Sequence, residues 1–120
     1  MDAIWLSNHG GRQLDTSPSP IEVLPEVRKR LNELNSSMKV FIDGGVKKGS
    51  DIFKCLALGA DYVFVGRGFI FSLVNGEEGI HNAFEILKTE LKTTMRLCGV
   101  KSVAEINESY VKVLKPISRL

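Results

Sequence analysis

Residues 6–15 read Leu-Ser-Asn-His-Gly-Gly-Arg-Gln-Leu-Asp. They begin at the end of an apolar run that starts at residue 3. An imidazole transfers protons near neutral pH, and a guanidinium binds a carboxylate through two parallel hydrogen bonds. Gly10 and Gly11 have no Cβ, so the chain can turn sharply and aim His9 and Arg12 at one small volume. We therefore expect a site for a substrate whose carboxylate lies beside a carbon bearing C–H and O–H. A polar surface loop is the alternative interpretation.

The pattern of strand, loop and helix recurs along the first 70 residues. A capping-box spacing at Ser19 and Glu22 predicts the start of the first helix, although Pro25 either kinks that helix or marks its true start. Polar or glycine-rich residues follow every strand, which is typical of α/β barrels with a site at the C-terminal ends of the strands. The predicted elements are strands at 3–7, 39–42 and 62–65, the first of them buried on both faces, and helices at 20–35 and 50–58.

Two of the loops resemble phosphate cradles. Residues 43–49 read Asp-Gly-Gly-Val-Lys-Lys-Gly, in which glycines allow close backbone approach while Lys47 or Lys48 supplies charge. The successive N–H groups and the start of the next helix also attract anions. Residues 66–68, Gly-Arg-Gly, again place glycine and a cation after a strand. Each loop taken alone is a weak signal, because any turn from a strand to a helix can be glycine-rich, but the repetition of the pattern favours phosphate binding.

The C-terminal half reads as scaffold. A short apolar piece at 69–73 precedes a long helix at 78–97, whose apolar stripe we interpret as core and which Gly99 caps. A short helix begins at Ser102, and residues 110–120 form a tail.

Composition argues against several classes of function. A net charge of +2 over 120 residues argues against a nucleic-acid partner. The apolar runs are too short to span a membrane, and no secretory leader is predicted. Cys55 and Cys98 lack metal-site or disulfide spacing and are expected to be small buried hydrophobes. His81 has no neighbouring ligand type, so it is expected to be exposed or locally satisfied, and we predict no metal site.

Three segments, at 7–15, 43–49 and 59–67, resemble the C-terminal third of the FMN-dependent 2-hydroxy acid oxidases and dehydrogenases. The resemblance covers residues 3–110 and implies that residues 1–120 are a partial domain of this family. It implies an α/β fold, namely the C-terminal part of a (β/α)8 TIM barrel, strands six to eight with their helices. It also implies (S)-2-hydroxy acid oxidase chemistry, in which FMN is the cofactor and a small 2-hydroxy acid becomes a 2-oxo acid.

The resemblance also assigns residue roles. His9 becomes the proton acceptor, and His9 and Arg12 together bind the substrate. Two positions depart from the family pattern, because Lys47 stands where arginine is usual and Gly68 stands where proline commonly follows the Gly-Arg pair. The implied FMN-binding positions are Ser7, Asp43, Gly44, Gly45, Val46, Lys47, Gly66 and Arg67.

The last three residues, Ser118-Arg119-Leu120, resemble the peroxisomal address of the Ser-Lys-Leu type. Together with the oxidase resemblance they predict a peroxisomal location, with the cytoplasm as the default, and oxygen as the electron acceptor that yields hydrogen peroxide. The resemblance further implies a homo-tetramer of complete subunits.

A closed barrel needs eight strands in about 250 residues, and this sequence supplies three strands. The resemblance places the flavin-facing lysine, the substrate tyrosines and the aspartate that orients the histidine before the part present here. We favour a piece of an oxidase that is active only within a full barrel. A non-redox, phosphate-binding barrel piece and a short non-catalytic chain that pairs with full-length subunits are the alternatives.

Overall fold

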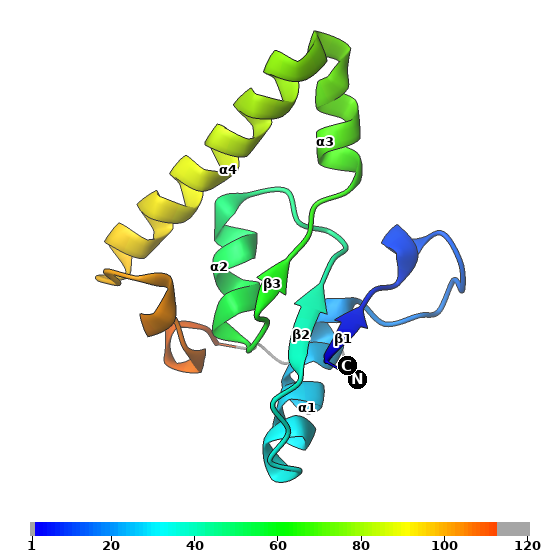
Figure 1. Ribbon diagram of the computed structural model, residues 1–120, viewed down its shortest axis with the longest axis vertical. Coiled ribbons are helices and arrows are strands. Elements are labelled where there is room, and N and C mark those ends of the chain that lie inside the picture. The colour runs from blue at the N-terminus through cyan, green and yellow to red at the C-terminus, as the bar shows by residue number, and fades with distance from the viewer. Residues whose placement is uncertain (1, 113–120) are drawn as a thin grey trace, which may run out of the picture.

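A computed structural model describes residues 2–112 of the chain. Its three strands form one parallel sheet in which spatial order follows sequence order (Figure 1). Leu6 lies opposite Ile42, and Ile42 lies opposite Val63, so the C-terminal ends of the strands meet at one end of the sheet. The three loops singled out in the sequence therefore come together there. The strands are β1 (Ala3–Leu6), β2 (Lys39–Ile42) and β3 (Tyr62–Val63).

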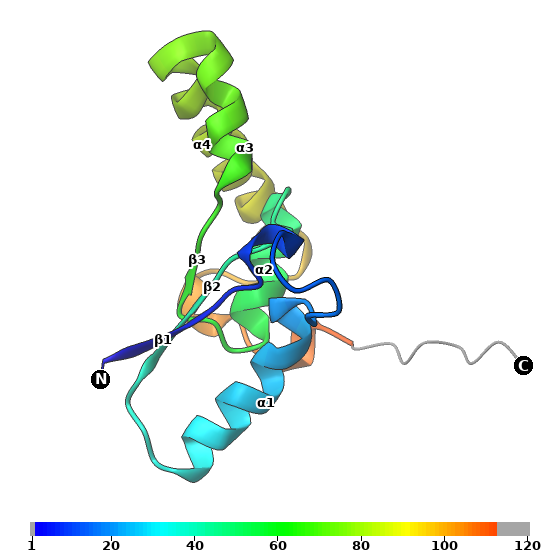
Figure 2. The same ribbon diagram turned by 90° about the vertical axis from the view of Figure 1, so that its right-hand side faces the viewer.

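Two helices, α1 (Pro20–Glu33) and α2 (Gly49–Ala57), cover one face of the sheet (Figure 2). Because alternate strand residues point to opposite faces, Val40 and Ile42 both reach these helices. They are buried among Leu24, Leu31 and Cys55. This packing forms the main core and fixes where each strand ends.

The opposite face of the sheet is bare. Trp5, Phe41, Tyr62 and Phe64 lie on it, and we call this set the aromatic sheet face. Trp5 stacks on Phe64 with ring centroids 4.5 Å apart, yet Trp5 and Tyr62 remain 54% and 56% exposed. The expectation that the first strand is buried on both faces is therefore met on one face only, since no helix among residues 2–112 covers the other (Figure 2).

After β3 the chain forms a helical hairpin. It comprises α3 (Arg67–Ser72), a 3-10 turn η2 (Leu73–Asn75) and the long helix α4 (Gly76–Leu97) (Figure 1). The Gly49 N–H donates to Glu90 Oε2 at 2.7 Å, and a Cβ at Gly49 would lie 2.1 Å from the Leu91 nitrogen. α2 and α4 can therefore pack this closely only with glycine at 49.

A second, smaller core closes the C-terminal side. Phe53 and Ala57 of α2 pack there with Val100 and Ile106. Two 3-10 turns, η3 (Val103–Glu105) and η4 (Glu108–Tyr110), carry the chain past this core.

At the N-terminal ends of β2 and β3, Asp61 ties three elements together. Its carboxylate accepts hydrogen bonds from the Val40 N–H at 2.8 Å, from Arg28 of α1 and from Lys39 Nζ at 3.2 Å. Burial alone raises the pKa of Asp61, but these donors outweigh it, so the pKa lies below its ordinary value of 3.8. Asp61 is thus ionised and bonded in the folded chain.

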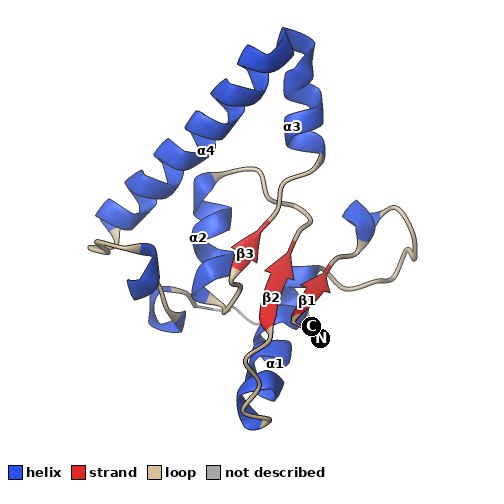
Figure 3. Cartoon of the chain, in the orientation of Figure 1, coloured by secondary structure: helices blue, strands red, loops and turns tan. Residues whose placement is uncertain are grey.

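The sequence-based elements are largely confirmed (Figure 3). β3 ends two residues early, the piece at 69–73 is part of a helix and its following turn, and α1 begins at Pro20 with Pro25 inside it. Cys55 is buried as predicted, and burial, with the charge of Asp51, raises its pKa to about 11.

The prediction for Cys98 is wrong, because this residue caps the end of α4 and is exposed. His81 is exposed, as expected. The tripeptide at 118–120 lies outside the described residues. Within residues 2–112, no helix combines the length and apolar character needed to cross a membrane.

Candidate functional site

The loop after β1 folds into a left-handed turn. His9, Gly10 and Gly11 form the 3-10 turn η1 with φ angles of 55°, 67° and 74°, and Arg12 follows directly at its end. The Gly11 N–H donates to the Asn8 carbonyl at 3.0 Å, which closes the turn. A left-handed conformation is unfavourable for a residue with a Cβ, so His9 is held there by its surroundings. Both His9 and Arg12 are exposed at this turn.

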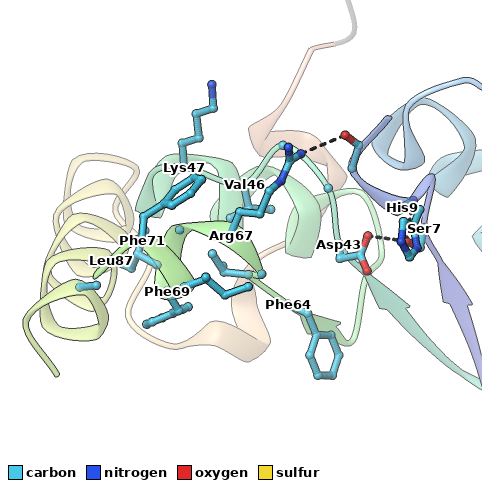
Figure 4. Close-up of a pocket in the computed structure, with 18 of the residues that line it drawn as sticks. Ser7, His9, Asp43, Val46, Lys47, Phe64, Arg67, Phe69, Phe71 and Leu87 are labelled. Atoms are coloured by element: carbon cyan, nitrogen blue, oxygen red, sulfur yellow. Dashed lines mark hydrogen bonds between the residues drawn. The ribbon is translucent and has the colours of Figure 1, made fainter. Parts of the chain in front are cut away.

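Asp43, the first residue after β2, joins the second strand to this turn. One carboxylate oxygen accepts from Ser7 Oγ at 2.7 Å and the other from the Trp5 indole Nε1 at 3.0 Å. Ser7 Oγ in turn accepts the His9 backbone N–H at 3.1 Å, and the bond between Ser7 and Asp43 is drawn as a dashed line in Figure 4. A continuous set of hydrogen bonds therefore runs from Trp5 to the backbone of His9.

Residues 43–48, between β2 and α2, form a loop that we call the glycine loop. Some of its backbone N–H groups have no acceptor among the described residues. Gly44 and Gly45 have φ angles of 91° and 75°, which only glycine adopts readily. Within the described part of the chain, the N–H groups of Gly44, Gly45 and Val46 donate to no acceptor. A Cβ built on Gly45 would meet nothing within 4 Å, so this backbone borders open space.

The start of α2 does not offer the anion site that the sequence suggested. Asp51 Oδ2 accepts the N–H groups of Lys47 and Lys48, each at 3.0 Å, and Glu90 accepts that of Gly49. Protein carboxylates thus already occupy these donors, and the prediction of anion attraction by this helix start is corrected. The Lys47 side chain extends away from Asp43 and His9 (Figure 4).

Arg67, at the start of α3, reaches across to the first loop. Its Nη2 donates to the Gly10 carbonyl at 2.9 Å, and a Cβ on Gly10 would lie 2.6 Å from the same nitrogen (Figure 4). The tip of the guanidinium therefore contacts Gly10 of the His9–Gly11 turn, which we call the His9 turn, and it links the loop after β3 to the loop after β1.

These loops border one open cleft of about 1030 Å³. Phe69, Phe71 and Leu87 of the helical hairpin line its apolar end, while the three loops form its polar end (Figure 4). Every residue predicted for the site borders this cleft: Ser7, His9, Arg12, Asp43, Gly44, Gly45, Val46, Lys47, Gly66 and Arg67. Their grouping in space is thereby established, whereas their chemical roles remain predictions.

Sequence reasoning missed Trp5 and the apolar end. A signal for Trp5 was available, since residues two apart on a strand share a face and Trp5 precedes Ser7 by two. The apolar end comes from α4 and the helix before it, whose residues read as ordinary core. In residues 2–112 no three His, Cys, Asp or Glu side chains are placed to hold a metal ion.

Comparison with known proteins gives consistent matches. The family model described as FMN-dependent dehydrogenase matches residues 1–113. Glycolate oxidase 2 of rice (Oryza sativa subsp. indica) is 50% identical over 109 residues, which cover 90% of this chain and 29% of the relative. 2-Hydroxyacid oxidase 1 of Mus musculus is 46% identical over 113 residues, covering 93% of this chain and 30% of the relative.

Among solved structures, a doubly substituted flavocytochrome b2 with sulfite bound matches with a TM-score of 0.88 and 46% identity. That match covers 91% of this chain and 29% of the other. The chain thus spans less than a third of the length of these relatives. On the strength of the family model and these matches, the chain belongs to the FMN-dependent dehydrogenase family.

Proposed function

We propose that the cleft supplies the base and the cofactor-phosphate end of a site that oxidises a small 2-hydroxy acid to a 2-oxo acid with FMN. The observation that carries the proposal is that the His9 turn, the glycine loop and Arg67 border one cleft. We also propose that β1, β2 and β3 are part of a (β/α)8 barrel, because both outer strands have an unpaired edge among the described residues.

The substrate roles fall to the His9 turn. The Arg12 guanidinium binds the substrate carboxylate through two hydrogen bonds and thereby orients the neighbouring carbon. The His9 imidazole accepts the hydroxyl proton of that carbon, which is the role of a general base near neutral pH. Because His9 begins the turn and Arg12 ends it, one small substrate can meet both side chains.

The residues present fit the phosphate end of FMN. The free N–H groups of Gly44, Gly45 and Val46 and the cation of Arg67 are donors suited to a phosphate ester. The open space beside Gly45 leaves room for the group. When bound, FMN supplies the acceptor for the two electrons that the substrate loses.

Further assignments follow from the resemblance and belong to the proposal. The electron acceptor of the second half-reaction is oxygen, the complete subunit forms a homo-tetramer, and the protein is addressed to the peroxisome. Two relatives named as oxidases support the first of these.

A chimera tests the proposed function. This chain would replace the matching 109-residue segment of rice glycolate oxidase 2, and turnover of glycolate and FMN absorbance would be measured. We expect an active, yellow chimera in which His9→Ala lowers kcat by about 10²-fold or more while FMN stays bound.

The second histidine provides the matched control. His81 is exposed on α4 and does not border the cleft, so His81→Ala should leave kcat unchanged. Normal turnover by the His9→Ala chimera would refute the base assignment. A colourless chimera would refute the cofactor assignment and favour a non-redox phosphate site.

A second candidate function is association with full-length subunits without catalysis. The exposure of the aromatic sheet face favours it, since such a surface is normally covered. Co-expression with rice glycolate oxidase 2 followed by affinity purification tests this candidate, and recovery of this chain alone would count against it.

A further inference from the structure

Beside the predicted site, the structure places one aromatic side chain that neither the resemblance nor the comparisons assign. We propose that Trp5 is a positioning residue of the flavin site, acting through its indole N–H on Asp43. The inference rests on the proposed function for its purpose, and its geometric part can be tested without a cofactor.

Asp43 is the junction on which the proposal depends. An ionised carboxylate only accepts hydrogen bonds, and here each of its oxygens has one donor, Trp5 Nε1 or Ser7 Oγ. Trp5 lies in β1 and Ser7 directly follows it, so the carboxylate is held against the end of the neighbouring strand. The free N–H groups of the glycine loop begin at the next residue, Gly44.

The same junction also holds the base. Ser7 donates to Asp43 and accepts the His9 backbone N–H at 3.1 Å. A displacement of the Asp43 carboxylate would therefore move the Ser7 side chain, which is hydrogen-bonded to the left-handed turn. Loss of the indole donor would free one oxygen of Asp43 to rotate. Ser7 would then follow it, and the backbone of His9 would lose a fixed partner.

Contacts with two neighbouring aromatic rings orient the Trp5 indole. Trp5 stacks on Phe64 with a centroid separation of 4.5 Å and an interplanar angle of 29°, and it meets Phe41 edge to face at 6.0 Å. Both contacts are available to any aromatic ring, whereas the N–H is specific to tryptophan. Trp5→Phe therefore removes the donor and retains most of the packing.

The first experiment uses NMR on the 120-residue chain. Trp5 is the only tryptophan, so its indole N–H gives a single cross-peak in a ¹⁵N-labelled sample. We expect Asp43→Ala to move that peak upfield and to speed its exchange with solvent. We also expect Trp5→Phe to shift the amide peaks of Ser7 and His9, with no change in Tm beyond that of the control.

Tyr62→Phe is the matched control. Tyr62 lies on the same aromatic sheet face with nearly the same exposure, 56% against 54%, and packs on the same Phe41, but it does not border the cleft. This variant also removes one polar hydrogen from an aromatic ring. The amide peaks of Ser7 and His9 should be unaffected by it.

The second experiment measures the FMN affinity of the chimera with rice glycolate oxidase 2 by flavin fluorescence. Trp5→Phe should weaken binding about three- to tenfold, as expected for one lost hydrogen bond, and Tyr62→Phe should not. In an Asp43→Ala background, Trp5→Phe should cause no further loss, since the two residues act as a unit.

The outcomes separate the inference from the proposed function. Unmoved Ser7 and His9 amide peaks in Trp5→Phe, or additive effects of the Trp5 and Asp43 substitutions on FMN affinity, would overturn the positioning role. If the chimera with wild-type Trp5 does not bind FMN while the amide peaks move as expected, the cofactor proposal fails and the positioning of the His9 turn stands.

Discussion

At the scale of single residues, the turn at His9–Gly11 is the most constrained feature of the site. Three successive residues adopt left-handed φ angles, and the first of them carries a side chain. Placing a Cβ in this conformation costs roughly 1–2 kcal/mol per residue. The chain therefore gives up stability to orient His9, which is a common property of active-site backbone.

Substitutions of Gly10 and Gly11 distinguish the effect of backbone strain from the effect of contact with Arg67. Gly10→Ala and Gly11→Ala should each destabilise the chain by about 1–2 kcal/mol through backbone strain. Only at Gly10 does the new Cβ also meet the Arg67 guanidinium, at 2.6 Å, whereas at Gly11 it meets nothing within 4 Å. We expect the Gly10 variant alone to displace Arg67 and to weaken binding of FMN further. Urea unfolding and flavin titration measure the two effects, and equal FMN affinities in the two variants would contradict this assignment.

The sequence was sufficient to predict which residues border the cleft, but not the hydrogen bonds between them. His9, Asp43 and Arg67 could be grouped because each follows a strand, and parallel strands bring their C-terminal ends together. The hydrogen bonds of Trp5 to Asp43 and of Arg67 to Gly10 join residues that are 38 and 57 positions apart. Such pairings depend on the register of the sheet, which the residue pattern does not encode.

At the scale of elements, each strand and helix has a local cause in the sequence, and the exceptions have tertiary causes. α1 begins at the capping box, where Glu22 Oε2 accepts the Ser19 N–H at 3.0 Å, and Pro25 lies inside the helix, where its missing N–H removes one helical hydrogen bond. Cys98 was misjudged because the apolar stripe of α4 does not extend to the helix end. The start of α2 lost its predicted anion site to two carboxylates, Asp51 in the same turn and Glu90, 41 positions from Gly49.

The Asp61 junction between α1, β2 and β3 predicts a pH dependence. Its donors lower the pKa of the folded state, so the carboxylate stabilises the fold at pH values above the ordinary pKa of 3.8. That contribution is lost as the pH falls through the lower, folded-state pKa. Asp61→Asn should therefore reduce the free energy of unfolding by about 1 kcal/mol near pH 7, and the difference should close below pH 3.8.

Denaturant titrations at a series of pH values measure this difference. Glu85→Gln is the control, because Glu85 also has a lowered pKa, caused first by its hydrogen bond to Lys88, but its side chain is 43% exposed on α4 and, among the described residues, bonds only within that helix. Its removal should leave stability unchanged at every pH. A difference for Asp61→Asn that persists at low pH would show that packing, not charge, is lost.

At the scale of the whole molecule, the described fold is open. The aromatic sheet face is uncovered among residues 2–112, where Trp5 and Tyr62 are more than half exposed. A chain of this shape is consistent with a proposed place inside a larger barrel, where that face would be the interior.

A single substitution on this face tests the barrel. Tyr62→Lys should change the stability of the isolated chain by no more than about 0.5 kcal/mol, because the side chain there is exposed. In the chimera with rice glycolate oxidase 2, the same substitution would place an unpaired charge in a closed interior and should cost several kcal/mol. Thermal unfolding of both forms measures the contrast. Val40→Lys, on the buried face, should unfold both, and equal tolerance of Tyr62→Lys in the two forms would argue against the barrel.

The strand order has a consequence for how the chain folds. Each strand pairs with the one made before it, Ala3 with Lys39 and then Phe41 with Tyr62. As the chain leaves the ribosome, β2 can dock on β1 and β3 can dock on β2, with no need to wait for a later segment. The sheet can therefore grow in the direction of synthesis, with a loop closed at each step and no earlier pairing undone.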